Sequence, residues 1–76
     1  MNNMGKKIKE ARLYNGFTQR ALADKLHLTQ DSISLWEQGK RLPDTQYLPN
    51  LCINLKITAD YLLGLEDETG KKLYEC

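Results

Sequence analysis

Two threonines, Thr18 and Thr29, stand directly before short helix-forming segments, and their spacing constrains the fold more than any other feature of the sequence. A threonine in this position caps a helix, because its hydroxyl accepts a hydrogen bond from a free backbone N–H of the first turn. The first segment ends near Leu26 and the second spans residues 30–38, so only "HL" lies between Leu26 and Thr29. Two helices joined by so tight a turn have the spacing of a helix-turn-helix.

Three further segments also predict helices, one before this pair and two after it. Met4, Ile8 and Ala11 repeat at helical spacing until an "NG" stop signal ends the segment. A fourth helix is expected after Asp44, with a proline in its first turn, where a missing N–H is tolerated. Thr58 caps a fifth segment, "ADYLLG". The sequence therefore predicts an all-α fold.

The turns "LHLT" and "LKIT", which precede the third and fifth helices, have the same form. In each turn the second residue, His27 or Lys56, is expected to end a helix in the left-handed region, where glycine is the easiest residue to place. The apolar faces of the helices predict a core that includes Ala21, Leu22, Leu26, Leu28, Ile33, Trp36, Leu51, Cys52 and Leu55.

Seventy-six residues allow one small domain, which we expect to be a compact five-helix domain over residues 4–64. Residues 65–76 form a short C-terminal tail with a "TG" turn signal. A small hairpin, a partner-binding arm and a disordered tail are all compatible with that segment. Leu13 and Tyr14 lie off the apolar face of the first helix, and we expect them to pack against the tail, at Leu73 and Tyr74, or to form part of a subunit contact.

The composition is that of an ordinary soluble globular protein, with 41% hydrophobic and 28% charged residues. No apolar run approaches the roughly 20 residues of a membrane helix. The basic N-terminus "MNNMGKKIKEAR" lacks the apolar stretch of a signal peptide. We therefore expect a cytoplasmic protein without a membrane segment.

No set of residues predicts catalysis. Ser32 and Ser34 have no histidine placed beside them by a local motif, and His27 belongs to the tight turn. The chain has no glycine-rich phosphate-binding loop. One histidine and two cysteines are too few soft ligands for a metal site. We expect no enzyme activity, no metal and no cofactor.

The charge of the chain is unevenly distributed. Residues 1–41 contain eight lysines and arginines against four acids, a net charge of +4, whereas residues 42–76 contain three against six, a net charge of −3. Such asymmetry predicts a phosphate-facing surface in the first half. A solvated surface whose charges are merely segregated would give the same pattern.

From Met4 to Gly64 the chain resembles the lambda-repressor-like (Cro/XRE) helix-turn-helix family of DNA-binding domains. The resemblance is carried by "MGKKIKEAR", "FTQRALADKLHLTQDSISLWEQGKRLP" and "YLPNLCINLKITADYLLG". Its most telling element is Thr18-Gln19, followed eleven residues later by Gln30 and then by "I", "WEQGK" and "P". This ordered set across five helices is far more specific than a single helix-turn-helix pattern.

The resemblance implies that the helix at residues 30–38 lies in the DNA major groove, where Gln30, Asp31 and Leu35 read bases. A glutamine pairs bidentately with adenine N6 and N7, a contact worth about 1–3 kcal/mol of discrimination. Asp31 can accept from a cytosine amino group and can also favour the N-terminus of its own helix. Leu35 either meets a thymine methyl group or is an ordinary exposed leucine.

The resemblance also implies contacts with the DNA backbone, which fix the register of the protein. Gln19 matches a family glutamine that binds a phosphate and braces the first side chain of the recognition helix, here Gln30. Arg12 and Glu37 match positions that form a structural pair in relatives. The residues expected to bind the backbone are Gln19, Ser34, Gln38, Lys40 and Arg41, with Lys6, Lys7 or Lys9 as further sources of positive charge.

The implied function is that of a sequence-specific transcriptional regulator, a repressor, that binds double-stranded DNA. We expect a homodimer on a near-palindromic operator, with the two major-groove segments about 34 Å apart. No small-molecule ligand is implied. The alternative is a protein-interaction adaptor or antitoxin-like partner that uses the same helical domain. The net charge of only +1, Leu35 and the pair Leu13 and Tyr14 support that alternative.

Overall fold

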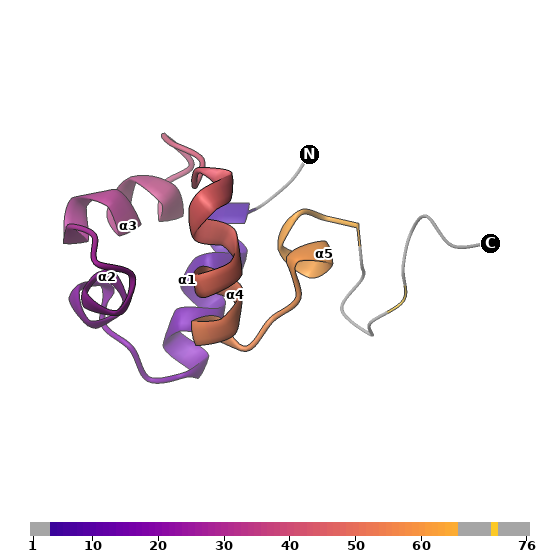
Figure 1. Ribbon diagram of the computed structural model, residues 1–76, viewed down its shortest axis with the longest axis horizontal. Coiled ribbons are helices and arrows are strands. Elements are labelled where there is room, and N and C mark those ends of the chain that lie inside the picture. The colour runs from indigo at the N-terminus through magenta and orange to yellow at the C-terminus, as the bar shows by residue number, and fades with distance from the viewer. Residues whose placement is uncertain (1–3, 66–70, 72–76) are drawn as a thin grey trace.

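The computed structural model of this chain describes residues 4–65 and residue 71, and every regular element in them is helical (Figure 1). The elements are α1 (Met4–Tyr14), α2 (Gln19–Leu26), α3 (Gln30–Glu37), the short 3₁₀ helix η1 (Thr45–Tyr47), α4 (Leu48–Leu55) and α5 (Ala59–Leu62). The predicted fold of five α-helices is confirmed. The open question of the tail falls almost wholly on residues 66–70 and 72–76, which lie outside the described residues.

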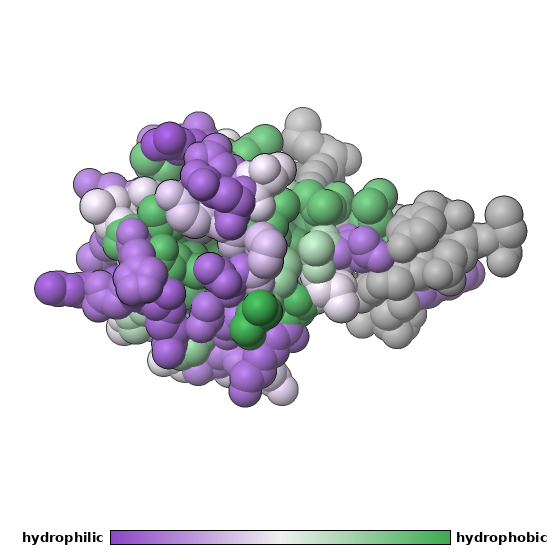
Figure 2. All heavy atoms as spheres, in the orientation of Figure 1, coloured by the Kyte–Doolittle hydropathy of each residue, from purple (hydrophilic) through white to green (hydrophobic). Residues whose placement is uncertain are grey.

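Figure 1 shows α1 and α4 in the middle of the molecule, with α2 and α3 on one side and α5 on the other. The surface reflects this division (Figure 2). Hydrophilic side chains dominate the end formed by α2, while hydrophobic ones gather over α4 and beside α5. None of the helices in residues 4–65 combines the length and the apolar character that crossing a membrane requires.

Threonine hydroxyl groups cap three of the helices, as the sequence predicts. Oγ1 of Thr18 accepts from the backbone N–H of Ala21 at 3.0 Å, and Oγ1 of Thr58 accepts from that of Tyr61 at 3.0 Å. Thr29 makes the same contact with Ser32 at 3.4 Å. Each hydroxyl satisfies one N–H that the helix itself leaves free, so these residues fix where α2, α3 and α5 begin.

The helix ends next to the tight turns adopt the predicted left-handed conformation. His27 has a φ of 57° at the end of α2, and Lys56 has a φ of 59° at the end of α4. The backbone N–H of His27 points back to the carbonyl oxygens of Ala23 and Asp24. Both turns therefore have the conformation of a glycine C-cap without containing glycine.

The core brings together the inner faces of all five α-helices. Its members are Met4, Ile8, Leu22, Ala23, Leu26, Ile33, Trp36, Leu51, Cys52, Leu55 and Leu62. Two expected members differ: Ala21 is only half-buried and Ala23 is buried instead, and Leu28 packs against the core without being enclosed. The reason is the direction of each side chain around the helix axis. Leu22, Leu26 and Ala23 lie within a sector of about 100° around the axis of α2, and Ala21 lies outside this sector.

The segment between α3 and α4 differs in detail from the prediction. The third helix ends at Glu37, and Gln38 is its C-cap. After Asp44 the chain first forms the 3₁₀ turn η1, and α4 begins only at Leu48. Pro49 lies in the first turn of α4, as expected.

The N-terminal end of α1 crosses the C-terminal end of α3 at Gly5. A Cβ atom at this position would lie 2.8 Å from the carbonyl oxygen of Glu37 and would also overlap that of Trp36. Both neighbours are backbone atoms, which cannot move aside as a flexible side chain would. Glycine at this crossing therefore lets α1 support α3 at close range.

Candidate nucleic-acid interface

The first turn of α3 presents two polar side chains to solvent, Gln30 and Asp31. One turn later, Ser34 and Leu35 are half-buried. Leu35 was expected on the outer face of the helix, and its side chain is less exposed than that position predicts. The following loop folds back here, since the backbone N–H groups of Lys40 and Arg41 both donate to the Leu35 carbonyl oxygen, at 3.0 and 3.3 Å.

Arg12 of α1 and Glu37 of α3 form a buried ion pair. Arg12 Nε donates to Glu37 Oε2 at 2.6 Å, and Arg12 Nη2 donates to Glu37 Oε1 at 3.2 Å. The third nitrogen, Nη1, donates to the carbonyl oxygen of Phe17 at 2.8 Å. The Arg12 and Glu37 side chains are only 9% and 4% exposed. This bidentate pair ties α1 to the end of α3, and the bond to Phe17 ties α1 to the residue that precedes the N-cap of α2.

Gln19, the first residue of α2, extends this ion pair toward the first turn of α3. Its Nε2 donates to Glu37 Oε1 at 3.0 Å, and its Oε1 lies 3.5 Å from Nε2 of Gln30. The family resemblance implies the contact between Gln19 and Gln30, whereas nothing in the sequence predicts the contact between Gln19 and Glu37. Arg12, Glu37, Gln19 and Gln30 therefore form one continuous path of hydrogen bonds.

The remaining predicted backbone-binding residues lie around the C-terminal end of α3. Gln38 Nε2 donates to Ser34 Oγ at 2.6 Å, so these two side chains are neighbours one turn apart. Lys40 and Arg41 are exposed in the loop that follows. The structure thus places Gln30 and Asp31 at one end of α3 and these four residues along and beyond its other end.

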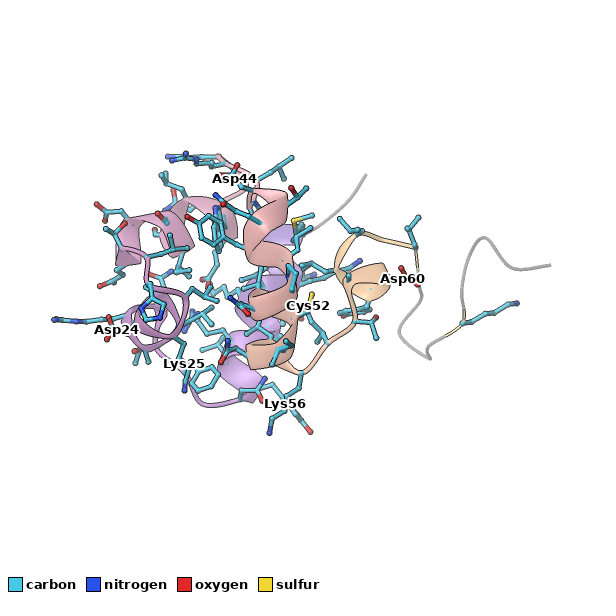
Figure 3. All side chains as sticks on the ribbon, viewed as in Figure 1. Asp24, Lys25, Asp44, Cys52, Lys56 and Asp60 are labelled. Atoms are coloured by element: carbon cyan, nitrogen blue, oxygen red, sulfur yellow. The ribbon has the colours of Figure 1, made fainter. Side chains whose placement is uncertain are left out.

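Lys7 does not belong to this surface, in contrast to its expected contribution of positive charge. Its Nζ donates to the carbonyl oxygen of Tyr61 in α5 at 2.8 Å and lies 4.8 Å from the centre of the Tyr61 ring. In Figure 3, Asp60 marks the position of α5, which lies on the opposite side of the molecule from Asp24 in α2. Lys7 therefore holds α5 to α1, while Lys6 and Lys9 stay exposed.

Cys52 is a free cysteine in the part of the chain that the structure describes. It belongs to the core, next to the other apolar residues of α4. Burial raises the pKa of this thiol above its usual 9.0, so the neutral form is favoured. Within residues 4–65 and 71, no cluster of three or more His, Cys, Asp or Glu side chains has an arrangement that could hold a metal ion.

Comparison with known proteins agrees with this geometry. Residues 5–68 match the family model described as a helix-turn-helix domain. The chain is 41% identical over 70 residues to the HTH-type transcriptional regulator ImmR of Bacillus subtilis (strain 168), covering 92% of this chain and 54% of ImmR. It therefore spans about half the length of that relative.

Solved structures show the same similarity. The P22 c2 repressor in complex with a synthetic operator superposes with a TM-score of 0.78 at 30% identity, covering 83% of this chain and 96% of that chain. The biofilm regulator SinR in complex with DNA gives a TM-score of 0.72 at 26% identity, over 79% of this chain and 97% of SinR. The lambda-repressor-like resemblance is confirmed, and the chain belongs to the helix-turn-helix domain family.

Proposed function

We propose that this chain is a sequence-specific DNA-binding regulator of transcription that places α3 in the major groove of its operator. The observation that carries the proposal is the first turn of α3, where Gln30 and Asp31 are exposed beside the N-terminus of α2 and Gln30 is braced by Gln19. The P22 c2 repressor was solved in complex with a synthetic operator and SinR in complex with DNA, which supports the same role here.

In this proposal Gln30 and Asp31 form hydrogen bonds with base edges, and Leu35 makes an apolar contact with a base. The free edge of the Gln30 amide offers one donor and one acceptor, the pattern that matches adenine N7 and N6. Asp31 can only accept while ionised, so it selects an amino group such as cytosine N4. Its position in the first turn of α3 also complements the positive end of the helix dipole.

The backbone contacts come from residues on both sides of this first turn. Gln19 stands in the first turn of α2, where free backbone N–H groups favour a phosphate. Ser34, Gln38, Lys40 and Arg41 form a second group at the other end of α3. These contacts supply affinity and register, whereas Gln30, Asp31 and Leu35 supply sequence preference.

We further propose a cytoplasmic homodimer on a near-palindromic operator, acting as a repressor that blocks access of polymerase. Two copies would place their α3 helices in major-groove segments about one helical turn apart. This role involves no catalytic step, no cofactor and no small-molecule ligand.

A protein-interaction role is the second candidate, and exposed apolar side chains on α1 favour it. Leu13 is 58% exposed and Tyr14 is 92% exposed, so the described residues do not cover them. Their expected partners in the tail, Leu73 and Tyr74, lie outside the described residues. These side chains would suit either a second copy of the chain or an unlike protein.

Salt dependence separates the two candidates. Binding of the purified chain to duplex DNA is measured between 50 and 200 mM salt, concentrations over which about six phosphate contacts lose roughly a thousandfold in affinity. A DNA regulator should show a steep linear loss on logarithmic axes, and Lys40→Ala should reduce the slope. Absence of sequence-selected binding even near 50 mM salt would leave the protein-interaction role as the better account.

A further inference from the structure

The pair Asn15 and Gly16, which follows α1, has the chemistry of spontaneous asparagine deamidation. It is the "NG" stop signal of the sequence, and Asn-Gly occurs at no other position in the chain. Gly16 has a φ of 77°, and a Cβ atom at this residue would meet nothing within 4 Å. Because glycine has no side chain, the Gly16 backbone nitrogen is open to approach by the Asn15 amide.

Deamidation forms one bond and breaks another within the chain. The backbone nitrogen of Gly16 loses its proton and attacks Cγ of Asn15, the Cγ–Nδ2 bond breaks, and Nδ2 leaves as ammonia with that proton. Water then opens the resulting succinimide ring at either carbonyl group, which gives aspartate or isoaspartate. The reaction needs only water and no oxidant, in keeping with the thermal lability of asparagine.

The folded chain holds both reacting groups away from this reaction. The Gly16 backbone N–H donates to the Leu13 carbonyl oxygen at 3.0 Å, so the proton that must leave is engaged. Nδ2 of Asn15 donates to the carbonyl oxygens of Ala11 at 2.8 Å and Leu55 at 2.9 Å. Ring closure requires the Asn15 amide to leave both acceptors and to turn back onto Gly16. Attack therefore requires the end of α1 to open, which costs free energy.

The product does not fit the native packing. Leu55 is the last residue of α4, where carbonyl groups lack partners within the helix, and Asn15 supplies a donor from α1. An ionised aspartate formed from Asn15 accepts hydrogen bonds and donates none. Its oxygens would face the carbonyl oxygens of Ala11 and Leu55 with no proton between them. Isoaspartate in addition lengthens the main chain by a carbon atom.

We propose that Asn15 is a deamidation site that the native fold protects, so that it converts in chains that have opened, and that the conversion then weakens the docking of α1 on α4. The modification thus records opening of the domain and favours further opening. Since Gly5 and Arg12 of α1 contact α3, loss of this docking also weakens the support of α3. The inference concerns the fold of the chain and does not depend on the DNA-binding function proposed above.

The first test follows the full chain by mass spectrometry of its proteolytic fragments at mildly alkaline pH, with and without guanidinium chloride. In denaturant, Asn15 should convert much faster than Asn54, because the side chain of Leu55 hinders attack by the nitrogen that follows Asn54. Without denaturant, conversion of Asn15 should be slower by at least about tenfold, which corresponds to about 1.4 kcal/mol of opening free energy. In the unfolded chain, Gly16→Ala should slow the conversion, because the added Cβ hinders attack.

The second test uses Asn15→Asp, which reproduces one product of the reaction. Its Tm should fall, with the folding equilibrium constant reduced by about tenfold or more. Asn54→Asp is the matched control, because Asn54 also lies near a helix C-terminus and also donates to the carbonyl oxygen four residues earlier, that of Asn50, at 2.8 Å. That bond stays within α4, so Asn54→Asp should lower the Tm far less. If Asn15→Asp does not fold where Asn54→Asp does, the expected loss is present in its extreme form.

Four results would overturn the inference. The first two, equal conversion of Asn15 and Asn54 in denaturant or an unchanged rate in Gly16→Ala, contradict the assignment of the site. Equal conversion of Asn15 with and without denaturant contradicts protection by the fold. A Tm of Asn15→Asp that is no lower than that of Asn54→Asp contradicts the role of the bond between α1 and α4.

Discussion

Gly5 of α1 lies against the backbone carbonyl group of Glu37 in α3, with no room for a methyl group between them. Alanine in a helix interior is ordinarily about 0.5–1 kcal/mol more favourable than glycine. At this crossing we expect the reverse, a loss of about 1–3 kcal/mol from Gly5→Ala, because overpacking must move one helix backbone away from the other. Urea denaturation measures the loss, and Lys9→Ala on the exposed side of α1 should change stability by less than about 0.5 kcal/mol.

The ion pair between Arg12 and Glu37 predicts strong non-additivity. Glu37→Ala leaves a buried guanidinium without its partner and should cost about 3–5 kcal/mol. Replacing both residues at once, by Arg12→Met and Glu37→Leu, removes the buried charges together and should cost far less. The unfolding midpoints of the single and double variants provide the comparison. A loss in the double variant equal to the sum of the losses from Arg12→Met and Glu37→Leu alone would mean that the pair is not energetically coupled.

His27 offers a stabilising substitution. Its left-handed conformation costs an L-residue about 1–2 kcal/mol, whereas glycine adopts it freely but loses about 0.5–1 kcal/mol of backbone entropy. His27→Gly should therefore gain about 0.5–1 kcal/mol, which raises the Tm by about 2–8 °C in a domain of this size. Lys25→Gly, two residues earlier in the right-handed part of α2, is the matched control and should lower the Tm.

Cys52 predicts a loss of stability at alkaline pH. Because burial raises the pKa of this thiol in the folded state, its contribution is fully present below the usual pKa of 9.0 and is lost as the pH rises through the higher folded value. The free energy of unfolding should therefore decline above about pH 9. Cys52→Ala, with a lower starting stability, should show a shallower decline, and an identical slope in both chains would contradict the assignment.

Local signals carried most of the prediction of the fold. The start of a helix can be predicted from a capping threonine, because the hydroxyl and the N–H that it satisfies lie within three residues of each other. This holds for Thr18, Thr29 and Thr58. The left-handed turns at His27 and Lys56 follow from equally short-range chemistry. The face of α2 was assigned less well, since Ala21 and Ala23 have the same polarity and only the packed structure shows which one is buried.

The candidate site could be predicted less completely than the fold, because more of its contacts join residues that are distant in the sequence. Exposure of Gln30 and Asp31 could be anticipated from the position of Thr29 and the buried side of α3. By contrast, the hydrogen bond from Gln19 to Glu37 joins residues 18 apart, and that from Lys7 to the Tyr61 carbonyl group joins residues 54 apart. No local pattern encodes either contact, because both arise only when separate helices pack together.

The most direct test of the central claim, that α3 reads sequence through Gln30, is selection of bound duplexes by the unmodified chain and by Gln30→Ala. We expect the unmodified chain to enrich a near-palindromic sequence. We expect Gln30→Ala to lose preference at one position of each half-site, by about 1–3 kcal/mol, while the other positions keep theirs. An equal loss of affinity for every base at that position, with the selected sequence otherwise unchanged, would contradict the claim.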